Sequence, residues 1–177
     1  MLIAMCGLPA AGKSALAGEL ARALAAPVLS VDPVEAAVWR AGVGRGEPTG
    51  VAAYAVVQTL AAENLRLGLT VVVDAVNDAA EARAAWRGLA DREGVPLHFL
   101  EVRCSDPQVH RERLLGRRRD LDGFPEPTWA SVEARRAAFT DWRQDRLVLD
   151  SLRPLDELTA EALDHLRRPG SSARPSP

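Results

Sequence analysis

The segment GLPAAGKS, residues 7–14, matches the pattern G-x-x-x-x-G-K-[ST]. An apolar run, LIAMC at residues 2–6, precedes it, and a helical pattern, KSALAGELARAL at residues 13–24, follows it. In a strand–loop–helix setting, glycines let the backbone wrap around an anion, while exposed amides and the helix N-terminus favour negative charge. The segment therefore predicts a loop that holds a phosphate chain.

Lys13, within this loop, is the one lysine of the chain. We expect its ammonium to reach the outer phosphates of a nucleotide and the Ser14 hydroxyl to hold Mg²⁺. A glycine-rich turn with an incidental lysine is the alternative, but it does not explain why the one lysine stands here. Nucleotide contacts are expected from the loop and the residue after it: Gly7, Leu8, Pro9, Ala10, Ala11, Gly12, Lys13, Ser14 and Ala15.

Five short aliphatic runs alternate with helical patterns along the chain. This alternation predicts an α/β domain with a five-stranded parallel sheet and helices packed on it. The expected strands are Leu2 to Cys6, Val28 to Val31, Leu69 to Asp74, Leu97 to Arg103, and Arg146 to Asp150.

Local chemistry marks the ends of some elements. Asp78 with Glu81 has the spacing of a capping box, and Asp106 precedes a proline at an expected first helical position. Residues 41–50 hold four glycines and a proline, which predicts a mobile loop.

Length and charge limit the function. A chain of 177 residues has room for one domain, which we place at residues 1–168, followed by a disordered tail at 169–177. The net charge of −2 gives no sign of the excess positive charge expected for binding to nucleic acid or anionic lipid. The longest uncharged run, residues 48–62, is too short to cross a membrane. Two cysteines fit a reducing cytoplasm, and the sequence leaves the oligomeric state open.

Polar residues follow two of the expected strands. Asp74 ends an apolar run at the carboxyl edge of the sheet. We predict that it holds Mg²⁺ or faces the molecule that accepts a phosphoryl group; the alternative is that it caps a helix. Asp32 is the candidate base for an attacking hydroxyl, again with a helix cap as the alternative. Asn77 and Trp39 are candidates for contact with the molecule that accepts the phosphate. The alternatives are a turn residue for Asn77 and a buried core residue for Trp39.

An arginine-rich segment at 111–119 leads into a proline-broken stretch, and we predict a small lid at about residues 111–128. His110, Arg113 and Arg117 fall on one helical face, where three potential cations are not expected to pack against a core. The two arginines are candidate catalytic residues that stabilise a transferring phosphoryl group. A solvated basic face is the alternative.

Taken together, GLPAAGKS, Asp32, VVVDAVN and ERLLGR make the chain resemble the P-loop kinases that include polynucleotide 5'-kinase domains, chloramphenicol phosphotransferase, gluconate kinase and zeta toxins. The resemblance implies a three-layer P-loop NTPase fold with helices on both faces of the sheet and strand order 2-3-1-4-5. It also implies an acceptor-side aspartate at Asp32 and two lid arginines, Arg113 and Arg117, one near the γ-phosphate and one near the adenine.

The expected function is therefore transfer of the γ-phosphate of ATP, with Mg²⁺, to a hydroxyl of a small-molecule acceptor. Polynucleotide kinases tend to carry an arginine one helical turn after the acceptor aspartate, where this chain has Glu35. The alternatives are a nucleic-acid 5'-end kinase and a nucleotide-binding switch or toxin-like protein without small-molecule transfer.

Overall fold

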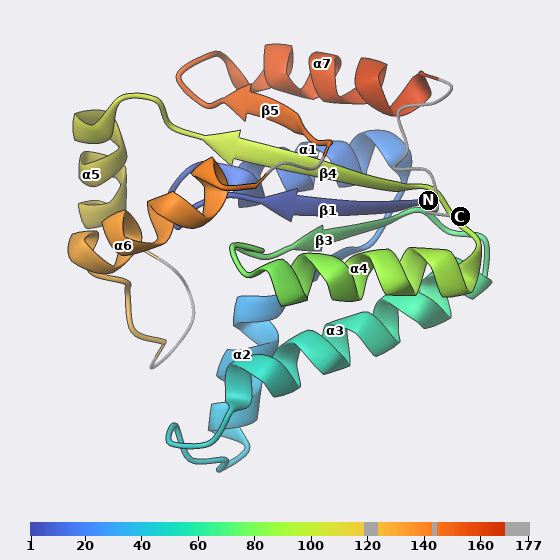
Figure 1. Ribbon diagram of the computed structural model, residues 1–177, viewed down its shortest axis with the longest axis horizontal. Coiled ribbons are helices and arrows are strands. Elements are labelled where there is room, and N and C mark those ends of the chain that lie inside the picture. The colour runs from blue at the N-terminus through green and yellow to red at the C-terminus, as the bar shows by residue number, and fades with distance from the viewer. Residues whose placement is uncertain (119–123, 143–144, 169–177) are drawn as a thin grey trace.

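One parallel sheet of five strands forms the centre of the computed structural model, which describes residues 1–118, 124–142 and 145–168. Figure 1 shows the strands running in one direction. The predicted fold class and strand order are confirmed. In spatial order the strands are β2 (Val28–Ser30), β3 (Val71–Asp74), β1 (Leu2–Cys6), β4 (Leu97–Arg103) and β5 (Leu147–Asp150).

Three strands are shorter than predicted. β2 ends at Ser30 because Val31 already belongs to the following helix, and β5 begins one residue after Arg146. β3 begins at Val71, since the Leu69 amide donates to the Asn64 carbonyl oxygen at 3.2 Å and so completes the turn after the preceding helix. The centres of all the predicted strands are correct.

Helices cover both faces of the sheet. α1 (Lys13–Leu24) and α7 (Leu155–Arg167) pack on one face, while α3 (Thr49–Arg66), α4 (Ala80–Glu93) and α6 (Trp129–Thr140) contribute to the core on the other (Figure 1). β1 feeds both cores because side chains alternate along a strand: Leu2, Ala4 and Cys6 face one core, and Ile3 and Met5 face the other. This arrangement confirms the three layers.

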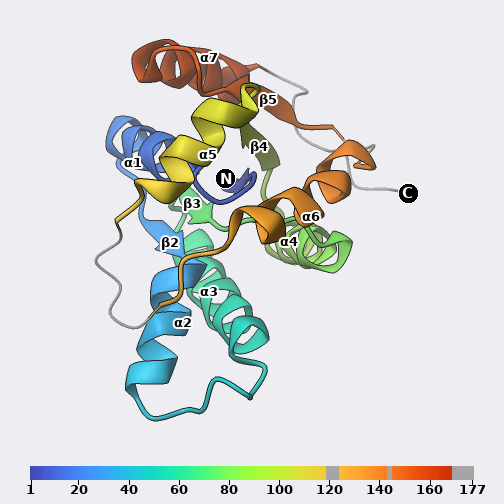
Figure 2. The ribbon, with the colours of Figure 1, turned by 90° about the vertical axis from the view of Figure 1, so that its left-hand side faces the viewer.

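α2 (Val31–Arg40) and the N-terminal part of α3 form an arm that extends beyond the sheet (Figure 2). The predicted loop at residues 41–50 is non-helical as far as Pro48, but its last two residues open α3. The indole of Trp39 donates to the Thr49 hydroxyl at 2.8 Å, and that hydroxyl donates to the Glu35 carboxylate at 2.7 Å. These two bonds tie the two helices of the arm together.

Of the two predicted helix starts, one is right. Asp106 caps α5 (Pro107–Leu115), because its carboxylate accepts from the amides of the second and third helical residues. The capping box at Asp78 is wrong: Ala79 occupies the cap position of α4, without a side-chain bond. Asp78 instead pairs with Arg135 of α6 at 3.5 Å.

The predicted tail at 169–177 and residues 119–123 of the predicted lid lie outside the described residues. Within the residues that the structure describes, none of the helices combines the length and apolar character needed to span a membrane.

Candidate active site

The loop between β1 and α1 has a backbone that depends on its glycines. Gly7 has φ of +133°, and a Cβ atom there would lie 2.1 Å from the carbonyl oxygen of Val102 in β4. Gly12 has φ of +103° and stands at the cap of α1. Both positions therefore exclude a side chain, the first by close approach and the second by backbone strain.

An open cavity of about 550 Å³ lies at the carboxyl edge of the sheet, the edge that Figure 2 views end-on. The loop forms its floor, and the starts of α1 and α2, the end of β3 and the region of α5 form its walls. It is lined by Pro9, Ala10, Gly12, Lys13, Ser14, Ala15, Ser30, Asp32, Pro33, Asp74, Ala75, Val76, Arg113 and Arg117. Most of the predicted site residues are thus brought together.

Lys13 lies at the base of this cavity with 7% of its surface exposed. Its ammonium donates to the Leu8 carbonyl oxygen at 3.1 Å, which holds the side chain against the loop. Burial lowers the pKa of Lys13, whereas the carboxylates of Asp74 and Asp32 act to raise it. The cation is therefore held within the electrostatic reach of both aspartates before any ligand binds.

The two aspartates reach the cavity from different kinds of element. Asp74 is the last residue of β3, as predicted. Asp32 does not end a strand: it is the second residue of α2, and Ser30 occupies the cap position of that helix. The alternative role of Asp32 as the helix cap is therefore wrong. Its carboxylate instead lines the cavity from the first turn of α2.

The oxygen donors of the cavity suit Mg²⁺. The Ser14 hydroxyl and the carboxylates of Asp32 and Asp74 line it together. Mg²⁺ at phosphate-transfer sites takes one or two carboxylates and completes its shell with substrate phosphates and waters. These donors fit that pattern, with Ser14 in the first turn of α1 and the two carboxylates on α2 and β3.

The two arginines of the predicted lid have different surroundings. Arg113 donates to the hydroxyl of Ser151 at 2.7 Å and to its carbonyl oxygen at 3.0 Å, which ties α5 to the turn after β5. Arg117 lies two residues beyond the end of α5, pairs with Glu126 at 3.7 Å, and acts through its charge to lower the pKa of Lys13. Arg117 therefore lies close enough for its charge to act on Lys13 of the loop.

His110 does not belong to the predicted basic face of α5. It is 1% exposed, and its Nε2 lies 2.8 Å from the carbonyl oxygen of Pro9. Burial lowers its pKa, so the side chain is not the third cation of a stripe with Arg113 and Arg117. The expectation that this face does not pack against a core is wrong at His110, because a neutral imidazole with a backbone partner can be buried.

Two predicted acceptor residues do not line the cavity. Trp39 stacks on Phe124, with ring centroids 5.0 Å apart, and the guanidinium of Arg45 lies 4.8 Å from the Trp39 ring centre. Asn77 is fully buried: its amide donates to the Met5 carbonyl oxygen at 2.7 Å, and its carbonyl oxygen accepts from the Trp86 indole at 2.8 Å. Trp39 joins the arm to Phe124, within the predicted lid segment, and Asn77 joins β1 to α4.

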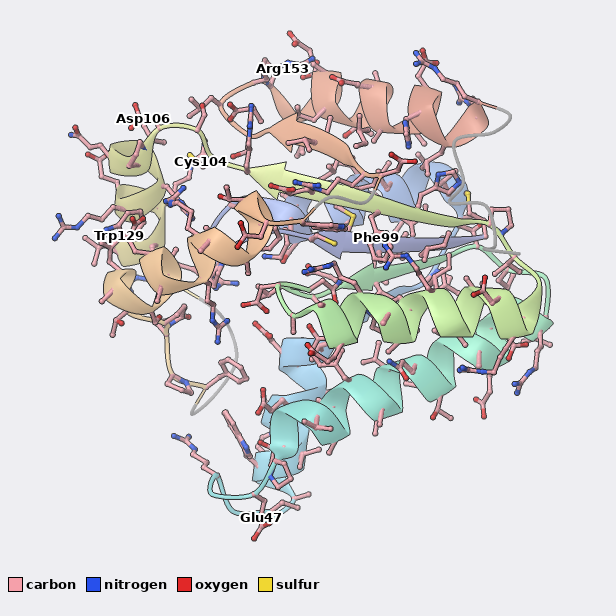
Figure 3. All side chains as sticks on the ribbon, in the orientation of Figure 1. Glu47, Phe99, Cys104, Asp106, Trp129 and Arg153 are labelled. Atoms are coloured by element: carbon pink, nitrogen blue, oxygen red, sulfur yellow. The ribbon has the colours of Figure 1, made fainter. Side chains whose placement is uncertain are left out.

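Three predicted loop residues, Gly7, Leu8 and Ala11, line a second cavity of about 460 Å³ instead of the first. Residues of the loop, β4, β5, α5 and α6 line it, and so does Cys104, which lies just beyond β4 (Figure 3). The nine residues of the predicted nucleotide loop therefore divide between two cavities.

Ser30 and Ser151 are contacts that the sequence did not point out. Ser30 ends β2 and lines the first cavity, and Ser151 follows β5 and binds Arg113. The rule that ligands of open α/β sheets bind at the carboxyl ends of strands, which selected Asp74, applies equally to these two serines.

Comparison with known proteins agrees with the fold described above. Residues 2–141 match the family model of an AAA domain. No curated protein sequence matches the chain. Three similar solved structures are kinases or a candidate kinase, and at their level of identity the similarity shows the shared fold. They are a candidate kinase from Chloroflexus aurantiacus (21% identity, TM-score 0.71, 94% of this chain and 95% of that one), the APS kinase CysC from Mycobacterium tuberculosis in complex with AMPPNP and APS (21%, 0.68, 94% and 97%), and a gluconokinase from Sinorhizobium meliloti (21%, 0.65, 92% and 89%).

The resemblance to P-loop kinases expected from the sequence is confirmed by these neighbours. The family match covers 2–141 of the 177 residues, and the sheet order is that of the expected fold. The chain therefore belongs to the AAA domain family and has the fold of the P-loop kinases.

Proposed function

We propose that the protein transfers the γ-phosphate of ATP, in the presence of Mg²⁺, to a hydroxyl of a small-molecule acceptor. The observation that carries this proposal is that Lys13, Asp32, Asp74 and Arg117 line one cavity above the loop. Phosphoryl transfer requires positioning and charge stabilisation more than covalent chemistry by the protein, and these four side chains supply both.

The loop and the arginines form the donor half of the cavity. The start of α1 at Lys13 directs its N-terminus at the position of the phosphates, and Lys13 and Arg117 add positive charge where charge develops during transfer. Bound Mg²⁺, held by Ser14 and a carboxylate, supplies further neutralisation of the phosphate oxygens.

We assign Ser30, Asp32 and Pro33, at the end of β2 and the start of α2, to the acceptor half, and Asp74 lines the same cavity. The acceptor oxygen attacks the γ-phosphorus while the bond from that phosphorus to the bridging oxygen breaks. ADP leaves with the electron pair of that bond. The proton of the acceptor hydroxyl passes to the Asp32 carboxylate, which acts as general base.

The comparisons support a small acceptor. The APS kinase structure is a complex with AMPPNP and APS, and the gluconokinase is named for a small sugar acid. Cys6 and Cys104 are free and buried, which is in keeping with the cytoplasmic location that we propose.

A transfer screen tests the proposal. The protein is incubated with γ-labelled ATP and Mg²⁺ over sugars, sugar acids, nucleosides, amino alcohols, hydroxylated antibiotics and a 5'-hydroxyl oligonucleotide. We expect transfer to a small hydroxyl compound, and loss of transfer in Lys13→Ala with an unchanged circular dichroism spectrum.

Thermal denaturation provides a second readout. A ligand at 100 times its Kd adds about 2.7 kcal/mol to the free energy of unfolding, so millimolar ATP with Mg²⁺ should raise the Tm of the wild type and not that of Lys13→Ala. No stabilisation of the wild type, or transfer to the oligonucleotide alone, would overturn the proposal.

A further inference from the structure

His110 joins two segments that are 101 residues apart in the chain. It lies on α5, and its Nε2 is 2.8 Å from the carbonyl oxygen of Pro9 in the phosphate loop. A carbonyl oxygen can only accept, so Nε2 carries the hydrogen. Nδ1 is buried without a hydrogen-bond partner among the described residues. This arrangement selects one neutral tautomer.

The surroundings of the ring favour the same state. The imidazole makes an edge-to-face contact with Trp129, at the start of α6, with ring centroids 5.4 Å apart and planes at 87°. Burial is the main cause that lowers the pKa of His110, with smaller contributions from the charges of Arg136 and Lys13. The Pro9 carbonyl and Glu133 act in the opposite direction. A second ring proton would add a buried donor that has no acceptor in the described part of the chain.

The partner of this bond lies at the candidate active site. Pro9 lines the 550 Å³ cavity, and so do Arg113, three residues after His110, and Arg117 beyond the helix. The bond therefore connects the loop that would hold the phosphates to the helix that brings both arginines to them. A misplacement of about 1 Å in such a site can cost about 100-fold in rate.

We propose that His110 is a positioning residue, whose neutral imidazole holds the Pro9 carbonyl and thereby fixes the spacing between the phosphate loop and the two cavity arginines, Arg113 of α5 and Arg117 just beyond it. The inference rests on the proposed function for its kinetic consequence. Its structural consequence, a loop ordered by α5, holds in the protein without nucleotide.

Three variants separate the effect of the hydrogen bond from the effects of side-chain size and burial. His110→Leu removes the donor and leaves the Pro9 carbonyl oxygen unpaired, whereas His110→Gln keeps an N–H donor on a side chain of similar reach. His98→Leu is the matched control: His98 is 5% exposed, its Nδ1 also lacks a partner among the described residues, and it lies on β4 away from both cavities.

Hydrogen exchange of the nucleotide-free proteins is the first readout. The Ala11 amide donates to the Leu8 carbonyl oxygen at 3.1 Å, so its protection reports on the order of the loop. We expect about tenfold faster exchange over residues 8–15 in His110→Leu, recovery in His110→Gln, and no change in His98→Leu. Unchanged exchange in His110→Leu would overturn the inference.

Kinetics below the melting temperature are the second readout. We expect His110→Leu to lower kcat/KM for ATP about tenfold, with His110→Gln within about threefold of the wild type. A role in stability alone would lower the Tm and leave kcat, KM and loop exchange unchanged, which would also overturn the inference. Failure of the wild type to bind ATP would refute the proposed function instead. The exchange experiment would still show whether the hydrogen bond from His110 to Pro9 orders the loop.

A measurement on the wild type avoids dependence on variants that do not fold. Long-range ¹⁵N–¹H correlation spectra distinguish the two neutral tautomers and the cation. We expect His110 to remain in the Nε2–H form at neutral pH, and an Nδ1–H form or a cation at pH 7 would contradict the proposed bond.

Discussion

Ser30 lies opposite Asp74 in the parallel ladder that joins β2 to β3. Asp32 comes two residues after Ser30, so this register brings a carboxylate from each of two neighbouring segments to one cavity. Both carboxylates act to raise the pKa of Lys13. The two acidic side chains therefore share one cation but stand on different elements, a strand end and a helix start.

Substitution of each aspartate should separate their roles. Asp32→Asn removes the base and should lower kcat by 10² to 10⁴ with ATP binding unchanged, because loss of a general base typically has that cost. Asp74→Asn should in addition raise the Mg²⁺ concentration needed for half-maximal rate. The measurement is turnover across a Mg²⁺ titration. Near-wild-type turnover in Asp32→Asn would make Asp74 the better candidate for the base.

Arg117 should matter where its neighbour Arg118 does not. Arg117 lines the cavity and Arg118 is exposed, so Arg118→Ala is a control for the loss of one arginine from the same segment. We expect Arg117→Ala to lower kcat by roughly 10² or more at saturating ATP, since a donor aimed at developing charge has effects of that size. Equal kcat in the two variants would count against a catalytic role for Arg117.

The close approach of the loop to β4 predicts a large stability effect at Gly7. In Gly7→Ala the new Cβ would meet the Val102 carbonyl oxygen, and the residue would also be strained at φ of +133°. Gly42→Ala carries a comparable strain at φ of +95° with no atom within 4 Å. We expect losses of about 3 to 5 kcal/mol and about 1 to 2 kcal/mol, measured by urea unfolding. Similar losses in both would mean that the loop can move away from β4.

Acidification should destabilise the fold through His98. Burial lowers the pKa of His98 to about 4, and the nearby His165 and the N-terminal ammonium contribute in the same direction. The unfolded histidine titrates near pH 6.5, so between about pH 6.5 and 4 the unfolded chain binds more protons and the free energy of unfolding falls as pH falls.

Urea unfolding at pH 7.5 and pH 5 checks this effect. His98 should account for about 1 to 2 kcal/mol of the difference, and His98→Leu should show a correspondingly smaller pH dependence. His110 and His165 have pKa values lowered in the same direction, so part of the dependence should remain. Identical pH dependence in wild type and variant would show that His98 does not contribute.

The fold and the floor of the cavity were predictable because their signals are local. The strands are apolar runs, the glycines and lysine of the loop have a fixed spacing, and Asp74 directly follows a buried run. Asp32 was placed correctly at the cavity but on the wrong element, because a proline next to it left the end of the strand ambiguous.

The errors arose where a distant partner decides the environment of a side chain. Helical spacing predicts that His110 belongs to a row of cations, but its partner is a loop carbonyl oxygen 101 residues away. Trp39 and Asp78 likewise pair with Phe124 and Arg135, which come much later in the chain. No local pattern contains such pairings, since they follow from the packing of α5, Phe124 and α6 against earlier elements.

Asn77 has a consequence for reading the evolutionary record of such proteins. Both halves of its buried amide are used, one by β1 and one by Trp86, and its φ of +54° suits asparagine better than most residues. Aspartate would lose the donor, and leucine would lose both bonds. We expect relatives that share this packing to keep an asparagine three residues after Asp74, and the hydrogen bonds of its buried amide explain that conservation without a contact to substrate.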